Sequence, residues 1–212
     1  MDKKEIKPMS VKTYISICRS LVRLAEDNIK AIKQQDEQLT RDILDEIRNF
    51  EESTEDSIHF MHADWILQNA IFISMYSHFE DKMWLTAYVL SEGKYLKIED
   101  LNGNGIENYR LYIEKIGEIQ QANEGVAEWG EIKHFRSIRN LLVHNGGMID
   151  KEGTKDIEKE KLYKFLKDND VIVAGRSGRI RIRNPKLLKR FMRTTSMFLE
   201  AIINAYNKKI SN

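Results

Sequence analysis

The sequence predicts an all-α protein, an up-and-down helical bundle with a small β-hairpin insertion near residues 171–183. Only two prolines and eleven glycines occur in 212 residues, so few positions interrupt a helix. Apolar residues recur three or four positions apart in most of the chain, which is the spacing of an amphipathic helix. Alternation with a period of two occurs in the short run RIRIR at residues 179–183, which favours a strand.

The first half of the chain is expected to form three helices. Ser10 can cap a helix that runs to about Gln35, and a second helix follows from about Glu37 to Phe50. Residues 57–91 are apolar nearly all round and carry aromatic side chains in both halves. This pattern is typical of a central helix packed by several neighbours, so we expect residues 57–91 to form the core helix.

Two more helices should follow the loop sequence LNGNG at residues 101–105. The first is short, from about Ile106 to Ala122. The second begins near Val126, keeps its apolar residues at helical spacing, and ends at the sequence HNGG, residues 144–147, because Asn and Gly tolerate left-handed conformations. This helix is expected to stop at or next to His144.

The last third of the chain changes character. Residues 150–170 are charged with a short helical patch at 162–166, and the turn GRSG between two strand-like runs predicts the hairpin at 171–183. Pro185 can occupy the first turn of a last helix that runs to about Lys209. We expect a single domain over residues 1–212: a helical core at about 57–145 plus 185–209, N-terminal helices at 10–50, and the basic hairpin.

Composition excludes several classes of protein. The chain has 34 Lys and Arg against 33 Asp and Glu, and 42% of its residues are hydrophobic, so it is neither disordered nor a globally basic nucleic-acid binder. The lone Cys18 cannot form an internal disulfide, which favours a reducing compartment. No apolar stretch follows the N-terminal MDKKEIKPMS, and no apolar run approaches the roughly 18 residues of a membrane span, so we expect a cytoplasmic protein without membrane contact.

The stretch FRSIRNLLVHNGG, residues 135–147, carries the most informative chemistry. Arg136 and Asn140 are four residues apart, as are Asn140 and His144, and Arg139 lies beside that line, so these side chains can converge at a helix end. Arginine matches phosphate oxygens with a fixed fork of donors, and histidine can move protons near neutral pH. These residue types suit a phosphodiester in RNA.

No metal or cofactor is expected from the sequence. The histidines and Cys18 form no zinc signature such as HExxH or paired CxxC. There is also no GxxxxGK[ST] phosphate loop and no GxGxxG after a strand.

At the run RNLLVH the sequence resembles the HEPN superfamily, whose all-α domains carry an arginine and a histidine separated by four to six residues, usually with Asn, Asp or His directly after the arginine. Here these residues are Arg139, Asn140 and His144. The resemblance covers the helical core and implies a bundle that dimerises so that two motifs face each other. It also implies a metal-independent endoribonuclease that leaves 2′,3′-cyclic phosphate ends, of the kind found in toxin–antitoxin, abortive-infection and CRISPR-associated defence.

The resemblance assigns each motif residue a role. His144 would be the general acid–base, Arg139 would stabilise the phosphorane charge, and Asn140 would fix the phosphate or the imidazole. Glu80, in the polar sequence SHFEDK, would orient Arg139 or His144, and Arg136 would add a second phosphate contact. The alternative for Arg139 and His144 is a structural role, in which they bond the last carbonyls of the helix and stabilise its dipole. The alternative for Arg136 and Glu80 is that they are ordinary surface residues.

A basic cluster lies in residues 171–193, which carry eight basic side chains and no acidic one. Such a concentration attracts polyanions even in a nearly neutral protein, although a solubilising hairpin edge is the alternative. The residues predicted to bind RNA are Arg176, Arg179, Arg181, Arg183, Lys186, Lys189 and Arg190. Trp65, Trp84 and Trp129 are assigned to packing, because none has the basic–aromatic alternation of a base-stacking platform.

The sequence therefore predicts a cytosolic endoribonuclease that acts on RNA as a homodimer with a composite active site and no cofactor. A cognate antitoxin or defence-system partner is a further expectation from the resemblance. The rival hypothesis is a non-catalytic helical module that dimerises or binds a nucleotide, RNA or a partner protein. A third is a nucleotidyl-transfer pair in which this chain is the modified toxin.

Overall fold

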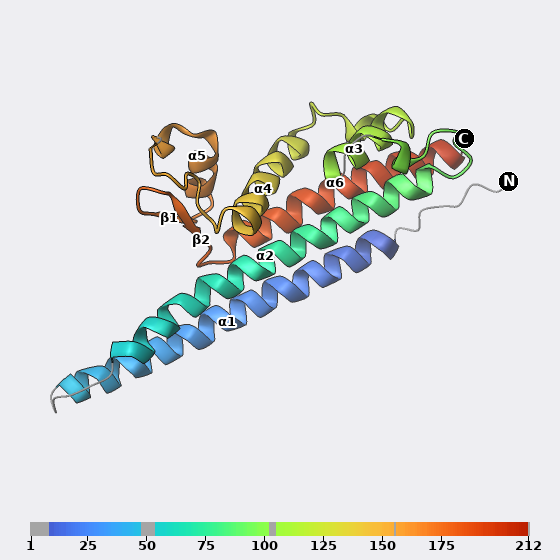
Figure 1. Cartoon of the computed structure of the whole chain (residues 1–212). Coiled ribbons are helices and arrows are strands. Elements are labelled where there is room, and N and C mark those ends of the chain that lie inside the picture. The colour runs from blue at the N-terminus through green and yellow to red at the C-terminus, as the bar shows by residue number, and fades with distance from the viewer. Residues whose placement is uncertain (1–8, 48–53, 102–104, 155, 212) are drawn as a thin grey trace. The chain divides into compact units, whose positions relative to one another are not determined.

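The computed structural model describes residues 9–47, 54–101, 105–154 and 156–211. It is mostly helical, with one small antiparallel hairpin, as the sequence predicts (Figure 1). The α-helices are α1 (Met9–Ile47), α2 (Thr54–Leu90), α3 (Ile106–Lys115), α4 (Ala127–His144), α5 (Lys161–Asp168) and α6 (Lys186–Ser211). The strands are β1 (Ile172–Ala174) and β2 (Arg179–Arg181), and short 3-10 helices lie at Ile98–Asp100, Gln120–Ala122 and Ile157–Lys159.

Two element boundaries differ from the sequence prediction. Residues expected to form two helices, at 10–35 and 37–50, form the single helix α1, and residues 48–50 lie outside the described part of the chain. The sequence QQDEQ near residue 36 is polar but holds no glycine or proline, so nothing in it breaks a helix. The helix expected at 106–122 ends earlier, at Lys115, where Gly117 and the left-handed Glu118 (φ 57°) turn the chain.

The chain divides into two compact units, and the division passes through four of the helices. The first unit contains Met1–Arg19, Ser74–Arg139 and Arg190–Asn212, and the second contains Ser20–Ile73 and Asn140–Lys189. Helix α4 therefore begins in the first unit and ends in the second. The single-domain organisation stays a prediction.

The core of the first unit is aromatic. The ring of Phe191 on α6 meets Phe135 of α4 edge-on at 5.1 Å, and meets Phe79 and Tyr76 of α2 at 6.1 Å each. All four side chains are buried. Each such ring pair adds about 0.5–1.5 kcal/mol beyond its buried area, so α2, α4 and α6 are held together here.

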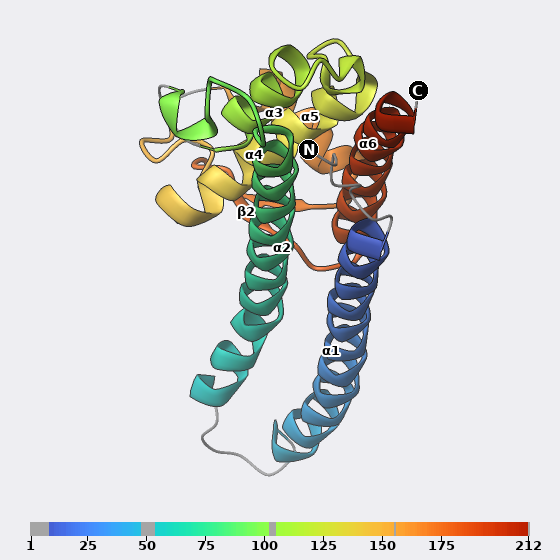
Figure 2. The ribbon, with the colours of Figure 1, turned by 90° about the vertical axis from the view of Figure 1, so that its right-hand side faces the viewer.

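Helix α1 joins this core through its first turns. The Tyr14 hydroxyl lies 2.6 Å from the Thr195 hydroxyl of α6, and the Tyr14 ring stacks on His78 of α2 at 5.2 Å. Figure 2 shows the courses of the long helices α1, α2 and α6. Burial lowers the pKa of His78 and raises the pKa of Tyr14. Both side chains are therefore neutral at pH 7, which suits a helix interface that excludes water.

The second unit packs the hairpin onto α2. The backbone N–H of Ile182 donates to Asn69 Oδ1 at 3.4 Å, and the side chain of Gln68 donates to the Ala25 carbonyl of α1 at 3.1 Å. Ile180 and Ile182 are buried, so the apolar positions of the alternating run face the core. In Figure 1 the hairpin and α5 lie together in this unit.

Helix α6 begins as expected from Pro185. The Asn184 side chain accepts a 2.9 Å hydrogen bond from the Lys186 N–H, and the Pro185 carbonyl accepts one from Lys189 at 2.9 Å. Pro185 thus stands in the first turn, where its missing N–H costs no hydrogen bond.

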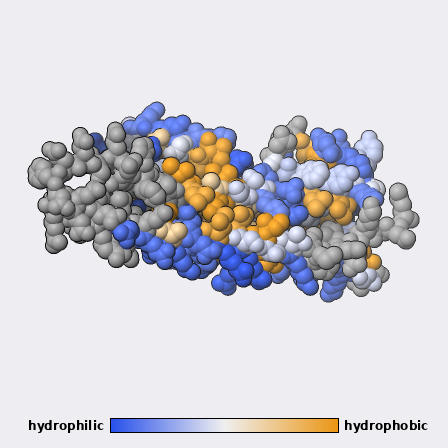
Figure 3. Space-filling view, turned by 90° about the horizontal axis from the view of Figure 1, so that it is seen from below, coloured by the Kyte–Doolittle hydropathy of each residue, from blue (hydrophilic) through white to orange (hydrophobic). Residues whose placement is uncertain are grey.

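Some large apolar side chains of the second unit remain exposed. Leu24 of α1 is 52% exposed, and Ile66 and Leu67 of α2 are 54% and 38% exposed. Figure 3 shows apolar side chains gathered on the face seen from below. Within the described residues, no helix combines the length and apolar character that crossing a membrane requires.

Candidate functional site

The motif residues lie in the last two turns of α4. Arg139 and Asn140 are half-buried, and His144 is the last residue of the helix and is exposed. Asn140 and His144 are one turn apart and share a face of the helix, as their spacing predicts. The His144 imidazole thus stands at the end of α4 and is exposed to solvent.

The side chain of Arg139 packs against the aromatic core of the first unit. Its guanidinium carbon lies 5.8 Å from the centre of the Tyr76 ring. Tyr76 is 2% exposed, and burial raises the pKa of its hydroxyl, with the Glu80 charge acting in the same direction and Arg136 and Arg139 in the other. The ring therefore provides a fixed, apolar surface for Arg139, and such contacts contribute about 0.5–2 kcal/mol.

Glu80 lies one turn after Tyr76 on α2 and is half-buried. A Cβ at Gly105 would come within 3.3 Å of Glu80 Oε1, so the start of α3 lies against this carboxylate. Besides burial, the Glu80 charge raises the pKa of Tyr109. The carboxylate is thus half-buried near the start of α3, and its predicted role in orienting Arg139 or His144 stays a prediction.

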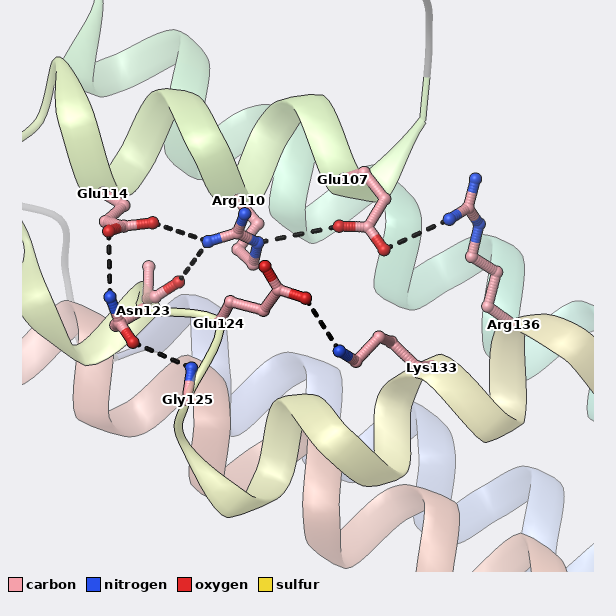
Figure 4. Close-up of polar contacts among 9 residues, drawn as sticks. Glu107, Arg110, Glu114, Asn123, Glu124, Gly125, Lys133 and Arg136 are labelled. Atoms are coloured by element: carbon pink, nitrogen blue, oxygen red, sulfur yellow. Dashed lines mark hydrogen bonds and ion pairs between the residues drawn. The ribbon is translucent and has the colours of Figure 1, made fainter. Parts of the chain in front are cut away.

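Arg136 is engaged in an ion pair. Its Nη1 lies 3.1 Å from Glu107 Oε1 of α3. Glu107 in turn lies 3.7 Å from Nε of Arg110, which pairs with Glu114 at 2.6 Å (Figure 4). Arg136 is thus part of a chain of charges that joins α3 to α4, although its side chain is 42% exposed, and its predicted phosphate contact stays a prediction.

This network is well buried around Arg110. Arg110 is 6% exposed, donates to the Ala122 carbonyl at 3.1 Å, and lies 5.4 Å from the centre of the Trp129 ring. Glu114 is 4% exposed, and hydrogen bonds lower its pKa, the largest effect coming from Lys115 and further ones from Arg110 and Asn123. Figure 4 shows Arg110, Glu114 and Asn123 pointing toward one another from α3 and the segment before α4. The pairing compensates the desolvation of Arg110 and fixes α3 beside the first turns of α4.

The turn after His144 depends on two glycines. Gly146 (φ 59°) and Gly147 (φ 75°) are both left-handed, and the Gly147 N–H returns to the Leu141 carbonyl at 2.8 Å. Lys151 Nζ donates to the His144 carbonyl at 3.2 Å, which satisfies one of the last helical acceptors. The sequence HNGG therefore ends α4 as predicted.

The same turn pairs with the basic strand. The Ile180 N–H donates to the Gly147 carbonyl at 2.8 Å, and Met148 forms an isolated antiparallel bridge with Arg179. Both partners belong to the second unit. The segment that follows His144 is thus hydrogen-bonded to β2 between Arg179 and Arg181.

The predicted RNA-binding residues fall into two groups. Three of them are already paired: Lys186 with Asp170 at 2.9 Å, Lys189 with Glu26 at 2.5 Å, and Arg190 with Glu131 at 2.6 Å. The other four lie on the hairpin or its turn: Arg176 and Arg183, which are exposed, and Arg179 and Arg181, which are half-buried.

The assignment of all three tryptophans to packing is wrong in part. Trp129 is fully buried, but Trp84 is 39% exposed and stacks on Tyr88. Trp65 is half-buried and lies under Arg181, whose guanidinium carbon is 5.6 Å from the ring centre. A basic–aromatic pair thus exists in space although Trp65 and Arg181 are far apart in sequence.

Sequence reasoning missed Tyr76 and Trp65 as partners of arginines. Tyr76 lies four residues before Glu80, on the same helix face, and this spacing was the one available signal. Within the residues whose structure is described, no three His, Cys, Asp or Glu side chains group as a metal site would require. Comparison of the chain with protein-family models, curated proteins and solved structures gave no match.

Proposed function

We propose that this protein is a metal-independent endoribonuclease of the HEPN type, which cleaves RNA by attack of the 2′-hydroxyl and leaves 2′,3′-cyclic phosphate ends. The observation that supports it most is the exposed His144 at the end of α4, one turn after Asn140. A second support is that Arg139, the residue beside Asn140, is packed against the buried Tyr76 ring.

The proposed chemistry uses side chains of this chain alone. His144 takes the proton of the 2′-hydroxyl or gives one to the leaving 5′-oxygen, since imidazole titrates near neutral pH. The 2′-oxygen attacks the phosphorus, the bond to the 5′-oxygen breaks, and the charge that builds on the phosphoryl oxygens is stabilised by Arg139. Asn140 holds the phosphate or the imidazole by hydrogen bonds.

RNA reaches this chemistry through the basic hairpin. The turn after His144 is bonded to β2, so Arg179 and Arg181 are attached to the end of α4 by backbone hydrogen bonds within the second unit. Guanidinium groups on a short strand attract the phosphate backbone regardless of base sequence.

The protein acts as a homodimer in this proposal, with one motif from each copy in a composite site. The exposed Leu24, Ile66 and Leu67 support association, because large apolar side chains left exposed are available to a partner. Light scattering on the purified chain tests the dimer, and a strict monomer would leave each motif alone. A cognate antitoxin or defence protein is the further proposed partner.

The experiment that tests the activity is incubation of the purified protein with total cellular RNA in EDTA. We expect cleavage with 2′,3′-cyclic phosphate ends, and a loss of about 100-fold or more in rate for His144→Ala, the lower end of what a general acid–base contributes. Val143→Ala, at an exposed neighbouring position of α4, is the matched control and should cleave like the parent. Intact RNA from a stable dimer would favour the non-catalytic binding module instead.

A further inference from the structure

The hairpin has two chemically different faces. The register pairs Arg181 with Ile172 and Arg179 with Ala174, so these four residues share one face. Ile180, between the two arginines, is fully buried on the other face, whereas Ile172 is 40% exposed. The outer face of the hairpin therefore presents two arginines beside an exposed aliphatic side chain.

Arg181 is held in place by an aromatic ring. Its guanidinium carbon lies 5.6 Å from the centre of Trp65, and its buried Nε has no hydrogen-bond partner among the described residues. The contact with the indole ring of Trp65, and not a hydrogen bond at Nε, therefore orients the planar guanidinium. Arg181 as a whole is half-buried, so part of it remains in contact with solvent.

The charges of this face are not neutralised within the described part of the chain. Lys186 and Lys189, at the start of α6, have carboxylate partners in Asp170 and Glu26. No carboxylate of the described residues forms an ion pair with Arg179 or Arg181, and Arg179 contacts the Met148 sulfur at 3.9 Å instead. The outer face thus keeps its affinity for anions.

We infer that the outer face of the hairpin binds single-stranded RNA, with phosphates at Arg179 and Arg181 and one nucleobase stacked on the Arg181 guanidinium above Trp65. The identity of the ligand as RNA rests on the proposed function. The contact of Arg181 with Trp65 and the charges of Arg179 and Arg181 are properties of the face itself. Arginines two residues apart on a strand are about 6.6–6.8 Å apart along it, which is comparable to the separation of successive phosphates in an extended chain. A base must be unstacked to reach the guanidinium plane, so a single strand fits this face and a duplex does not.

Binding can be measured apart from cleavage with an RNA analogue that lacks the nucleophile. We would use a fluorescein-labelled 2′-O-methyl oligonucleotide of about twelve nucleotides, within the site sizes of single-strand binders, and follow its anisotropy with the full chain at several salt concentrations. Arg179→Gln and Arg181→Gln should each weaken binding about tenfold and lower the slope of log K against log salt by about 0.7, the value for one phosphate contact. Lys208→Gln, a charge-matched change at an exposed position near the end of α6, should leave both unchanged.

The stacking is tested separately from the charge. Arg181→Lys keeps the positive charge but removes the planar guanidinium. It should therefore preserve the slope of log K against log salt and weaken binding about fivefold, near the lower end of the effect of losing base stacking. Trp65→Leu should have the same effect for the same reason.

The inference would be overturned by equal losses in Lys208→Gln and Arg181→Gln, or by equal affinity for the duplex of the same sequence. Equally effective competition by polyglutamate would also overturn it, because that would indicate an acidic protein as the ligand. Tight binding of the analogue by a chain that cuts no RNA would defeat the nuclease proposal alone. If cleavage depended on His144 but the Arg179→Gln and Arg181→Gln variants bound the analogue normally, this inference would fail and the nuclease proposal would stand.

Discussion

The backbone N–H of Ile180 donates a 2.8 Å hydrogen bond to the carbonyl oxygen of Gly147. Gly147 is the third residue after His144, and Ile180 lies between Arg179 and Arg181 on β2. The end of the motif helix and the basic strand are therefore joined through one hydrogen-bonded turn. A change in this turn should disturb both the position of His144 and the strand that is proposed to bind RNA.

Gly147→Ala should destabilise this turn. The residue has a φ of 75°, and a non-glycine residue pays about 1–2 kcal/mol in that region, so we expect the free energy of unfolding in urea to fall by that amount. Gly130→Ala is the control: Gly130 lies in the regular part of α4 with nothing within 4 Å of an added Cβ. It should raise the free energy of unfolding by about 0.5–1 kcal/mol, and a similar loss in both variants would contradict the account of the turn.

Tyr76 should position Arg139 through its ring. Tyr76→Phe keeps the ring and should cleave RNA within about twofold of the parent, whereas Tyr76→Leu should slow single-turnover cleavage about tenfold because Arg139 loses its support. Phe79→Leu removes another buried ring of α2 and serves as the control for core damage. If Phe79→Leu slowed cleavage as much as Tyr76→Leu, the ring of Tyr76 would have no special role.

These relationships show what the sequence could and could not predict. The positions of α2, α4, the hairpin and α6 followed from apolar spacing and from Pro185 and HNGG, because those signals are local. The Tyr76–Arg139 and Trp65–Arg181 contacts were not predicted, since each joins residues more than sixty positions apart. The break expected near residue 36 was wrong because polarity alone does not end a helix.

The same limit applies to the charges. The sequence predicts a cluster of eight basic residues but not which of them have partners, and Glu26, Glu131 and Asp170 each pair with one. Charge counts along a chain say nothing about pairs formed by folding. The candidate motif, in contrast, lies on one helix, so its spacing was enough to place Asn140 and His144 on one face.

Glu131 should be important for the stability of the first unit. Its carboxylate accepts hydrogen bonds from Arg190 at 2.6 and 3.2 Å and from Thr194 at 2.7 Å, which join α4 to α6. Glu131→Gln should lower the free energy of unfolding by about 1–2 kcal/mol, the range for a hydrogen bond to a charged partner at a partly exposed site. Glu124→Gln, which breaks an exposed pair with Lys133, should change it by less than about 0.5 kcal/mol.

The pH dependence of unfolding gives a second test of this pair. The hydrogen bond from Arg190 is the main cause that lowers the pKa of Glu131, so the folded state binds the proton less tightly than the unfolded state. The stabilisation is complete above the ordinary pKa of a glutamate and is lost as the pH falls through the folded value. Glu131→Gln should therefore lose less stability than the parent as the pH falls below about 4, the ordinary glutamate value. An equal loss in the two proteins would contradict this account.

Cys18 should be unreactive in the folded protein. The side chain is fully buried on α1, and burial raises the pKa of its thiol to about 11. At pH 8 very little thiolate is present, so iodoacetamide should not label the folded chain but should label it in concentrated urea. Because this is the one cysteine in the sequence, mass spectrometry gives a single-site readout, and rapid labelling without urea would show that the helix is not packed as described.

Stability should also respond to alkaline pH through the same thiol. The folded pKa of about 11 exceeds the ordinary value of 9.0, so the folded state holds the proton more tightly. The contribution to stability is complete below the ordinary value and is lost as the pH rises through the folded one. Cys18→Ala should lose less stability than the parent between pH 9 and 11, measured by urea unfolding at fixed pH.

The central claim is that His144 cuts RNA through the 2′-hydroxyl of the substrate without a metal. The most direct measurement is single-turnover cleavage, in EDTA, of a synthetic RNA that carries one 2′-deoxyribose at a mapped cut site, with the parent and His144→Ala proteins side by side. We expect the parent to cut the all-RNA strand and to spare the deoxy position, and His144→Ala to be at least about 100-fold slower on the all-RNA strand. Cleavage at the deoxy position, or equal rates for the parent and His144→Ala, would contradict the account.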